Sequence, residues 1–182
     1  MSDVATVRVR RGAYARLYAD AERASEALVW LIDERAEPEA GALEALRGAA
    51  AGGPAASLPV DERGAPVEAL LGRFAEGDVE ALLAGALERH VPLRHTHLMS
   101  LLAAREHVLA IDPPDDARLG AYAGDDWTRR LFARFGGVLV PASRVRVAGY
   151  ASGSPLHALR AARAGGWGRG EALRELGRSA RR

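Results

Sequence analysis

The chain has 182 residues, of which 48% are hydrophobic and 27% charged, a composition typical of one folded domain or of a small module joined to a larger one. Cysteine and lysine are both absent, which excludes disulfides, thiolate metal sites, thiol nucleophiles, the P-loop lysine and lysine Schiff bases. The net charge of +1 conceals an acidic middle, residues 19–128, and a basic last third, residues 129–182, with twelve Arg against two Glu.

The first predicted element is a short strand in Thr6–Arg10, where Val7 and Val9 share one face of the strand. Apolar residues at helical spacing then predict a helix from Ala13 to about Glu37, ended by Pro38, and a second short helix over residues 40–47. Residues 48–66 are rich in Ala, Gly and Pro without periodicity, and we expect a linker or loose loop there.

Helices are again predicted beyond residue 66, beginning at Val67, at Asp78 and at Thr96. Residues 107–116 leave open the end of a helix or a short buried strand. The segment "DDWTRRLFARFGG" predicts a helix with Asp125 or Asp126 as its N-cap and glycine at its end. Residues 138–140 and 144–147 alternate like a β-hairpin joined through Pro141, and two helices follow.

These elements predict an α+β fold that is mostly helical with a small β-sheet or hairpin. The expected organisation is an N-terminal strand-helix module over residues 1–47, a linker or loop over residues 48–66, and a helical domain over residues 67–182 with a C-terminal hairpin and a basic tail. The "VRVR" at Val7–Arg10 is repeated as "RVRV" at Arg144–Val147, which raises the alternative that these strands pair in one mixed sheet.

The opening strand and the helix after it resemble the start of a ribbon-helix-helix DNA-binding protein, over residues 6–34 only. The resemblance implies that two such strands pair between subunits of a homodimer and insert a polar face into the major groove. Thr6, Arg8 and Arg10 would then contact bases, with arginine bidentate to guanine as the most specific pairing that this composition allows. The glycine-containing turn that the family has between its helices is missing.

Four of the five histidines lie between His90 and His107, which makes this segment the alternative candidate site. His90, His95 and His97 could hold zinc or iron if the segment is extended. Surface or capping roles remain open for them, as does a general base oriented by Asp112, Asp115 or Asp116. The acids of "DPPDD" and "GDD" could likewise bind a divalent cation, although turn and cap roles are the usual ones for such acids.

The basic last third favours a nucleic acid or an acidic protein as partner, because clustered arginine neutralises phosphates. The alternative is an Arg-rich surface that pairs with the acidic middle of the same chain. Candidate nucleic-acid contacts there are Arg144 and Arg146, with Trp167 and Arg169 in "GGWGRG", which could stack on bases or form a simple turn.

The function expected from these patterns is that of a non-enzymatic, nucleic-acid-associated binding protein of bacterial type, cytoplasmic, without a cofactor or a membrane segment. Two other classes stay open. One is a small enzyme that uses the segment His90–His107, with or without a metal, and the other is an adaptor that binds protein through the Arg-rich last third.

Overall fold

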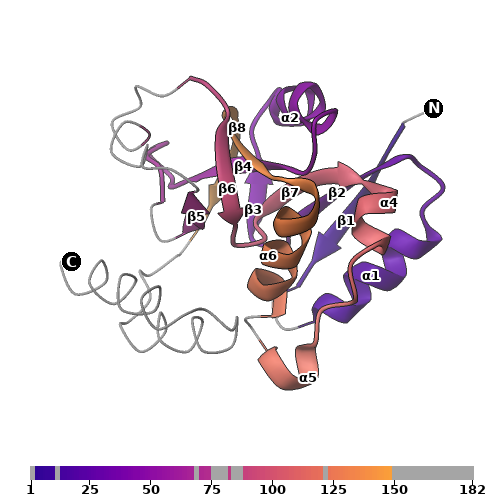
Figure 1. The fold of residues 1–182 in the computed structure, drawn as a ribbon. Helices are drawn as coiled ribbons and strands as arrows, with labels where there is room; N and C mark the ends of the chain where they lie inside the picture. The colour runs from indigo at the N-terminus through magenta and orange to yellow at the C-terminus, as the bar shows by residue number, and fades with distance from the viewer. Residues whose placement is uncertain are drawn as a thin grey trace.

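An eight-stranded mixed sheet, and not a set of helices, organises the chain in the computed structural model (Figure 1). The structure describes residues 3–10, 13–67, 70–74, 82, 88–120 and 123–148. The strand order is β1-β2-β7-β4-β8-β6-β5, with β3 paired to β8. The strands are β1 (Val4–Val9), β2 (Leu28–Asp33), β3 (Ala36–Pro38), β4 (Ala55–Val60), β5 (Arg73–Phe74), β6 (Val91–His95), β7 (Ser100–Ala104) and β8 (Val138–Val147). The helices of the described residues are α1 (Tyr14–Arg23), α2 (Ala42–Ala50), α4 (Arg105–Leu109), α5 (Asp116–Leu119) and α6 (Ala123–Phe135).

The first structural unit is a parallel pair of strands, β1 and β2, joined by α1. The helix predicted from Ala13 to Glu37 ends at Arg23, and the segment "LVWLID" is strand β2 instead. This strand lies between β1 and β7, and five of its six residues are buried. A strand covered on both faces carries a continuous apolar run, which does not differ in its periodicity from the buried part of a helix.

The alternation predicted for the opening strand is confirmed, because Val7 and Val9 are buried while Thr6 and Arg8 are exposed. The ribbon-helix-helix resemblance is wrong. Strand β1 pairs in parallel with β2 of its own chain, and α1 is followed by a strand where that family has its second helix. The suggested pairing of "VRVR" with "RVRV" is also wrong, since β8 pairs with β4, β3 and β6.

The segment that composition predicts as a linker contains a central strand of the sheet. Every residue of β4, Ala55–Val60, is buried, and the strand lies between β7 and β8. Its alanines and serine gave no periodic signal because small residues fit positions that are covered on both faces. The three-part division of the chain stays a prediction, but strands from all three parts belong to this one sheet.

Two further segments differ from their predictions, one in the type of element and the other in the number of strands. The helix expected from Thr96 is replaced by β7, of which Ser100 to Ala103 are buried. The expected hairpin is a single ten-residue strand, β8. Its register against β4 shifts between Val140, opposite Ser57, and Arg144, opposite Leu58. Pro141 therefore marks a bulge, because proline lacks the N–H that a regular ladder needs.

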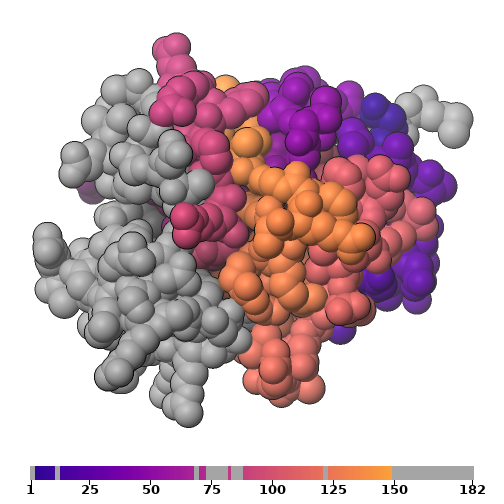
Figure 2. Space-filling view, in the orientation of Figure 1, coloured from indigo at the N-terminus to yellow at the C-terminus, as the bar shows by residue number. Residues whose placement is uncertain are grey.

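The prediction of a mostly helical fold is wrong, because an eight-stranded sheet organises the chain. This sheet separates two hydrophobic cores. One core joins the sheet to α1, α4, α5 and α6 and contains Leu17, Trp127 and Leu131. The other joins the sheet to α2 and contains Trp30 and Leu46. In the space-filling view, α6 and β8 lie between β6 and the helices α4 and α5 (Figure 2). Among the described residues, the helices are too short or too polar to cross a lipid bilayer.

Candidate active site

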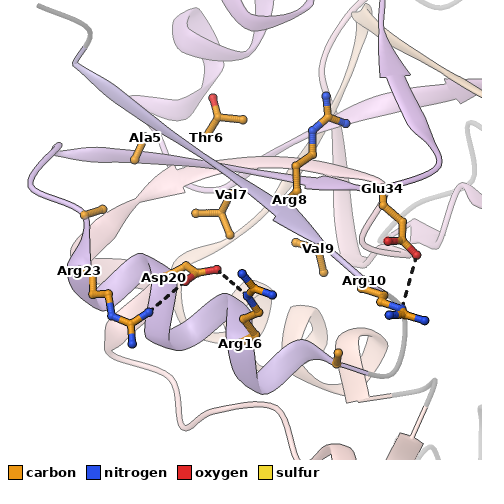
Figure 3. A pocket seen from close by; sticks show the side chains of 12 residues that line it. Ala5, Thr6, Val7, Arg8, Val9, Arg10, Arg16, Asp20, Arg23 and Glu34 are labelled. Atoms are coloured by element: carbon orange, nitrogen blue, oxygen red, sulfur yellow. Dashed lines mark hydrogen bonds and ion pairs between the residues drawn. The ribbon is translucent and has the colours of Figure 1, made fainter.

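The candidate site lies where β1 and β2 end side by side. The two strands are parallel, with Val9 opposite Asp33, so Arg10 and Glu34 follow them at the same edge of the sheet. The Glu34 N–H donates to the Val9 carbonyl at 2.9 Å, and Arg10 Nε lies 3.8 Å from Glu34 Oε1 (Figure 3). The carboxyl ends of adjacent parallel strands are the usual place for ligands in open sheets with helices.

Asp33 is fully buried and held by the arginine two residues later. The side chain of Asp33 has a relative exposure of 0% and that of Arg35 has 36%. Arg35 donates three hydrogen bonds to this carboxylate: from its backbone N–H and its Nε to Oδ1, at 2.9 and 2.8 Å, and from Nη2 to Oδ2 at 3.0 Å. The segment "DER" is thus a turn closed by its own charged side chains, which fixes a guanidinium at the end of β2.

Backbone hydrogen bonds link Asp33 to the loop before β7, which carries His97. The Asp33 N–H donates to the Met99 carbonyl at 2.9 Å, and the Met99 N–H donates to the His97 carbonyl at 2.7 Å. His97 Nδ1 lies 3.0 Å from Asp125 Oδ1, with the two side chains 21% and 10% exposed. The buried Thr128 hydroxyl donates to the Thr96 carbonyl at 2.7 Å, which ties this loop to α6.

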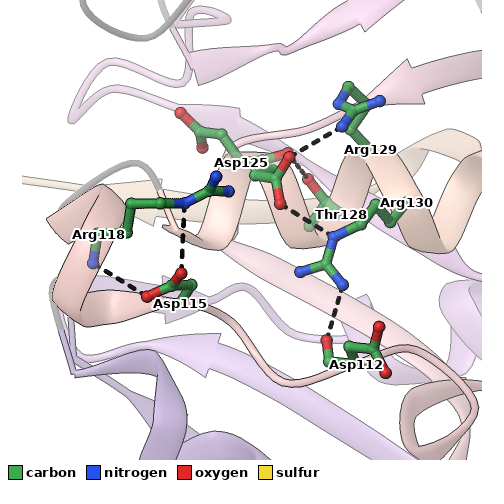
Figure 4. A network of polar contacts seen from close by, with 8 residues as sticks. Asp112, Asp115, Arg118, Asp125, Thr128, Arg129 and Arg130 are labelled. Atoms are coloured by element: carbon green, nitrogen blue, oxygen red, sulfur yellow. Dashed lines mark hydrogen bonds and ion pairs between the residues drawn. The ribbon is translucent and has the colours of Figure 1, made fainter. Parts of the chain in front are cut away.

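The first turn of α6 carries two carboxylates with different partners. Asp125 faces His97, whereas Asp126 accepts from Arg129 and from Arg130, each at 2.9 Å. Arg130 also donates to the carbonyl of Asp112 at 2.9 Å, and Figure 4 shows this network around the start of the helix. Both acids lie where the helix dipole stabilises negative charge. The helix predicted here is confirmed, but the N-cap role predicted for Asp125 or Asp126 is wrong, because α6 begins at Ala123 and both acids lie inside its first turn.

A groove of about 720 Å³ runs along β1 and reaches the site at Arg10 and Glu34. Arg8, Arg16 and Arg23 also line it, together with Asp20 (Figure 3). The basic residues of the groove that lie on α1 are neutralised locally. Asp20 lies 3.6 Å from Arg16 and 3.3 Å from Arg23, whereas the Arg8 guanidinium donates to the Ala36 carbonyl at 3.1 Å.

The predicted nucleic-acid contacts do not form one surface with a common role. Thr6 is exposed on β1, and Arg10 belongs to the site described above. Arg144 and Arg146 both lie near Glu39, at 3.7 and 3.5 Å, and Arg144 also donates to the Gly64 carbonyl. Trp167 and Arg169 lie outside the described residues.

The described part of the basic last third mostly pairs within the chain. Arg129 and Arg130 bind Asp126, and Arg144 and Arg146 approach Glu39. Arg134 donates to the Ala110 carbonyl at 2.7 Å. These contacts match the alternative in which the basic residues neutralise the acidic middle of the same chain.

The three candidate metal ligands are placed in different surroundings. His90 is exposed before β6, His95 is buried on β6 with 4% exposure, and the ring of His97 meets that of His95 edge-on at 6.1 Å between centroids. Within the described ranges, groups of three His, Cys, Asp or Glu with the spacing of a metal site are absent.

Sequence reasoning selected His97 but missed its carboxylate. Asp112, Asp115 and Asp116 were the expected orienting acids, and Asp125 is the one in contact. Asp33 was also missed, although one signal for it existed. An acid directly after a buried apolar run is typical of the end of a strand, and that signal was lost once "LVWLID" was assigned to a helix.

Comparisons with known proteins fix the fold class. Neither a known family model nor a curated protein sequence matches the chain. Among solved structures, the fold is similar to that of GalNAc-T7, a GalNAc glycosyltransferase whose structure was determined with UDP, GalNAc and Mn²⁺. The TM-score is 0.56 at 13% sequence identity, over 85% of this chain.

The chain spans only 34% of the length of that GalNAc-T7 chain. The expectation of a non-enzymatic, nucleic-acid-associated protein is wrong, because the strand that was to pair between subunits pairs with β2 of its own chain and the fold resembles that of a glycosyltransferase. The chain has a mixed, curled sheet, and its fold resembles that of a glycosyltransferase.

Proposed function

We propose that this chain is a glycosyl-transfer domain, which binds a nucleotide-activated sugar at the carboxyl ends of β1 and β2 and activates an acceptor hydroxyl with His97. The observation that carries the proposal is the His97–Asp125 pair, 3.0 Å apart, one short loop from Asp33 in a fold like that of GalNAc-T7. The groove along β1 reaches Arg10 and Glu34, which follow the ends of the same two strands, and it would hold the nucleotide-activated sugar.

The pair has the form of a general base with an orienting carboxylate. When the Nδ1–H of His97 donates to Asp125, the lone pair of the neutral ring is on Nε2, and Asp125 stabilises the imidazolium that forms after proton uptake. The acceptor O–H gives its proton to His97, and the acceptor oxygen forms a bond to the anomeric carbon of the sugar. The bond from that carbon to the phosphate oxygen breaks, and the nucleoside diphosphate leaves with the electron pair.

The Mn²⁺ in the GalNAc-T7 structure has no fitting set of ligands among the described residues of this chain. Both oxygens of Asp33 accept hydrogen bonds from Arg35, so a guanidinium occupies the position that a cation on this carboxylate would need. Asp126 is similarly occupied by two arginines.

The test is release of nucleoside diphosphate from a panel of UDP-, GDP- and ADP-sugars, with water or simple sugars as acceptors. His97→Ala should lower the rate of release by about 10²- to 10⁴-fold, the usual contribution of a general base. His90→Ala is the matched control, because His90 is exposed and precedes β6, and its rate should equal that of the wild type. Equal rates for the two variants would contradict the role of His97, and no release from any donor would contradict the proposed function.

The cytoplasmic location expected from the charged opening segment and the lack of a long apolar run stays a prediction.

A further inference from the structure

Strand β1 is an edge strand of the sheet, and β2 is its partner strand among the described residues. The Leu28 N–H donates to the Asp3 carbonyl at 3.4 Å, and the Glu34 N–H donates to the Val9 carbonyl at 2.9 Å, so β2 is bonded to β1 along its whole length. An edge strand also carries N–H and C=O groups on its other side, and these can pair with a further chain.

The alternation of the strand identifies the outward groups as those of Thr6 and Arg8. The carbonyls that accept from β2 belong to Asp3 and Val9, and successive residues of a strand direct their backbone groups to opposite edges. The odd-numbered residues of β1 therefore face β2, and the N–H and C=O groups of Thr6 and Arg8 point away from it. Each of these two residues presents a donor and an acceptor to an added strand.

The groove of about 720 Å³ follows this outward side of β1. Every residue from Ala5 to Arg10 lines it, although their side chains alternate between the two faces of the sheet, so the groove lies along the edge of the strand. The opposite wall is one side of α1, whose lining residues recur at intervals of three or four (Figure 3): Ala13, Arg16, Asp20, Arg23 and Ala24. A groove between an edge strand and a helix has the form of a site for an extended peptide.

The charge of the groove favours an acidic occupant. Four arginines line it against Asp20 and Glu34, which leaves a net charge of +2. The side chains of Arg10, Arg16 and Arg23 are 77%, 84% and 78% exposed, and their contacts with the two acids are 3.8, 3.6 and 3.3 Å long. Such exposed ion pairs contribute little free energy and can be exchanged for carboxylates of a ligand.

A second copy of the chain would fit this groove poorly. Pairing of two β1 strands would place Arg8 and Arg10 of one copy beside the same arginines of the other, and like charges on paired strands destabilise the pair. Charged side chains on edge strands commonly prevent such self-association. The same arginines attract a strand that carries Glu or Asp, so the charge that disfavours a dimer favours an acidic partner.

We propose that the groove between β1 and α1 binds an extended acidic segment of a partner protein, which joins the sheet as a strand beside β1. Thr6 and Arg8 supply the backbone hydrogen bonds, and Arg16 and Arg23 pair with acidic side chains of the segment. This docking goes beyond the proposed function and does not depend on it, because the open edge and its charge need no donor. If the groove also holds the donor, the segment and the donor compete, and the partner regulates access to the site.

The experiment uses a short fluorescein-labelled peptide in which Glu alternates with Thr, and a matched peptide with Arg in place of Glu. Fluorescence anisotropy with the full chain, in the absence of any sugar nucleotide, should show binding of the acidic peptide and much weaker binding of the basic one. Arg16→Glu should weaken binding of the acidic peptide about threefold to tenfold, because an exposed attraction becomes a repulsion. Arg63→Glu, which makes the same change of charge at an exposed position in the turn after β4, should bind like the wild type. Equal affinity for the two peptides, or no binding of either, would overturn the proposal.

Hydrogen exchange followed by NMR tests whether the peptide is added as a strand. In the free chain the amides of Thr6 and Arg8 should exchange faster than that of Val7, which faces β2, and the acidic peptide should slow both. Thr6→Pro removes an outward donor and leaves the ladder with β2 in place, so it should fold, as circular dichroism checks, and bind the peptide about tenfold more weakly. Peptide binding that leaves the Thr6 and Arg8 amides unprotected in the wild type would refute strand addition, whether or not this variant folds.

Further outcomes separate the acidic partner from a second copy and from the proposed function. Sedimentation of the free chain should show a monomer, and a dimer with protected Thr6 and Arg8 amides would overturn the proposal in favour of self-pairing. Peptide binding without release of nucleoside diphosphate from any donor would contradict the proposed function alone. Release without peptide binding would contradict the docking site alone.

Discussion

Gly72 supports the loop that carries His97, and its replacement by alanine gives a quantitative test of this packing. Its φ of +75° lies in the left-handed region, where a non-glycine residue costs about 1–2 kcal/mol. A Cβ atom at this position would also lie 2.6 Å from the Cα of Thr96, and closer still to the carbonyl oxygen of His95. Both are backbone atoms, so the loop must move, at a cost of about 1–3 kcal/mol for overpacking.

The two contributions together predict that Gly72→Ala lowers the free energy of unfolding by about 2–5 kcal/mol, a large part of the roughly 5–15 kcal/mol typical of a domain. Urea titration followed by tryptophan fluorescence measures this, because Trp30 and Trp127 are both buried. Gly136→Ala is the matched control, since Gly136 has a φ of +74° and a Cβ added to it would meet no atom within 4 Å, so it reports the backbone contribution alone. Equal losses in the two variants would refute the proposed packing of Gly72 against the loop.

Two further substitutions test hydrogen bonds on either side of the sheet. Ser100→Ala removes the acceptor of the Trp30 indole N–H, at 3.0 Å, and a partner of the Ser57 hydroxyl, at 2.7 Å, so we expect urea unfolding to show a loss of about 1–3 kcal/mol. An unchanged unfolding midpoint would mean that the buried serines do not need this contact. Tyr18→Phe removes a bond of 2.9 Å to the Leu109 carbonyl, which links α1 to the end of α4. This half-buried bond should contribute about 1 kcal/mol in a thermal melt, and a larger loss would point to a role beyond this bond.

The fold could be predicted from the sequence where one face of an element meets water. Val7 and Val9 alternate with exposed residues on β1, and α6 has acids in its first turn and glycine after its end, so both segments were assigned correctly. Strands β2, β4 and β7 could not be predicted in this way, because they are covered on both faces and their burial leaves no period. The topology of the sheet determines which strands are buried on both faces, and the local sequence pattern of a strand does not reveal its place in the sheet.

The candidate site was accessible to sequence reasoning only in part. His97 stood out because histidines are few, but Asp125 lies 28 residues further on, and only the packing of α6 against the loop brings the two together. The Asp33–Arg35 contact is local, and its spacing is visible in "DER". The contact can be inferred from this spacing only if β2 is a strand, because the same three residues inside a helix would not face one another.

The central position of β4 also determines when the sheet can be completed during synthesis. Ala55 of β4 pairs with Val138 of β8, so about 80 residues must be made after β4 before its second neighbour exists. At a synthesis rate of about 5–20 residues per second, that interval is roughly 4–16 seconds. During this time the edge of β4 that will face β8 has no strand beside it. A nascent chain in that state exposes a backbone edge on an apolar strand, which makes it a target for chaperones and a point at which aggregation can begin.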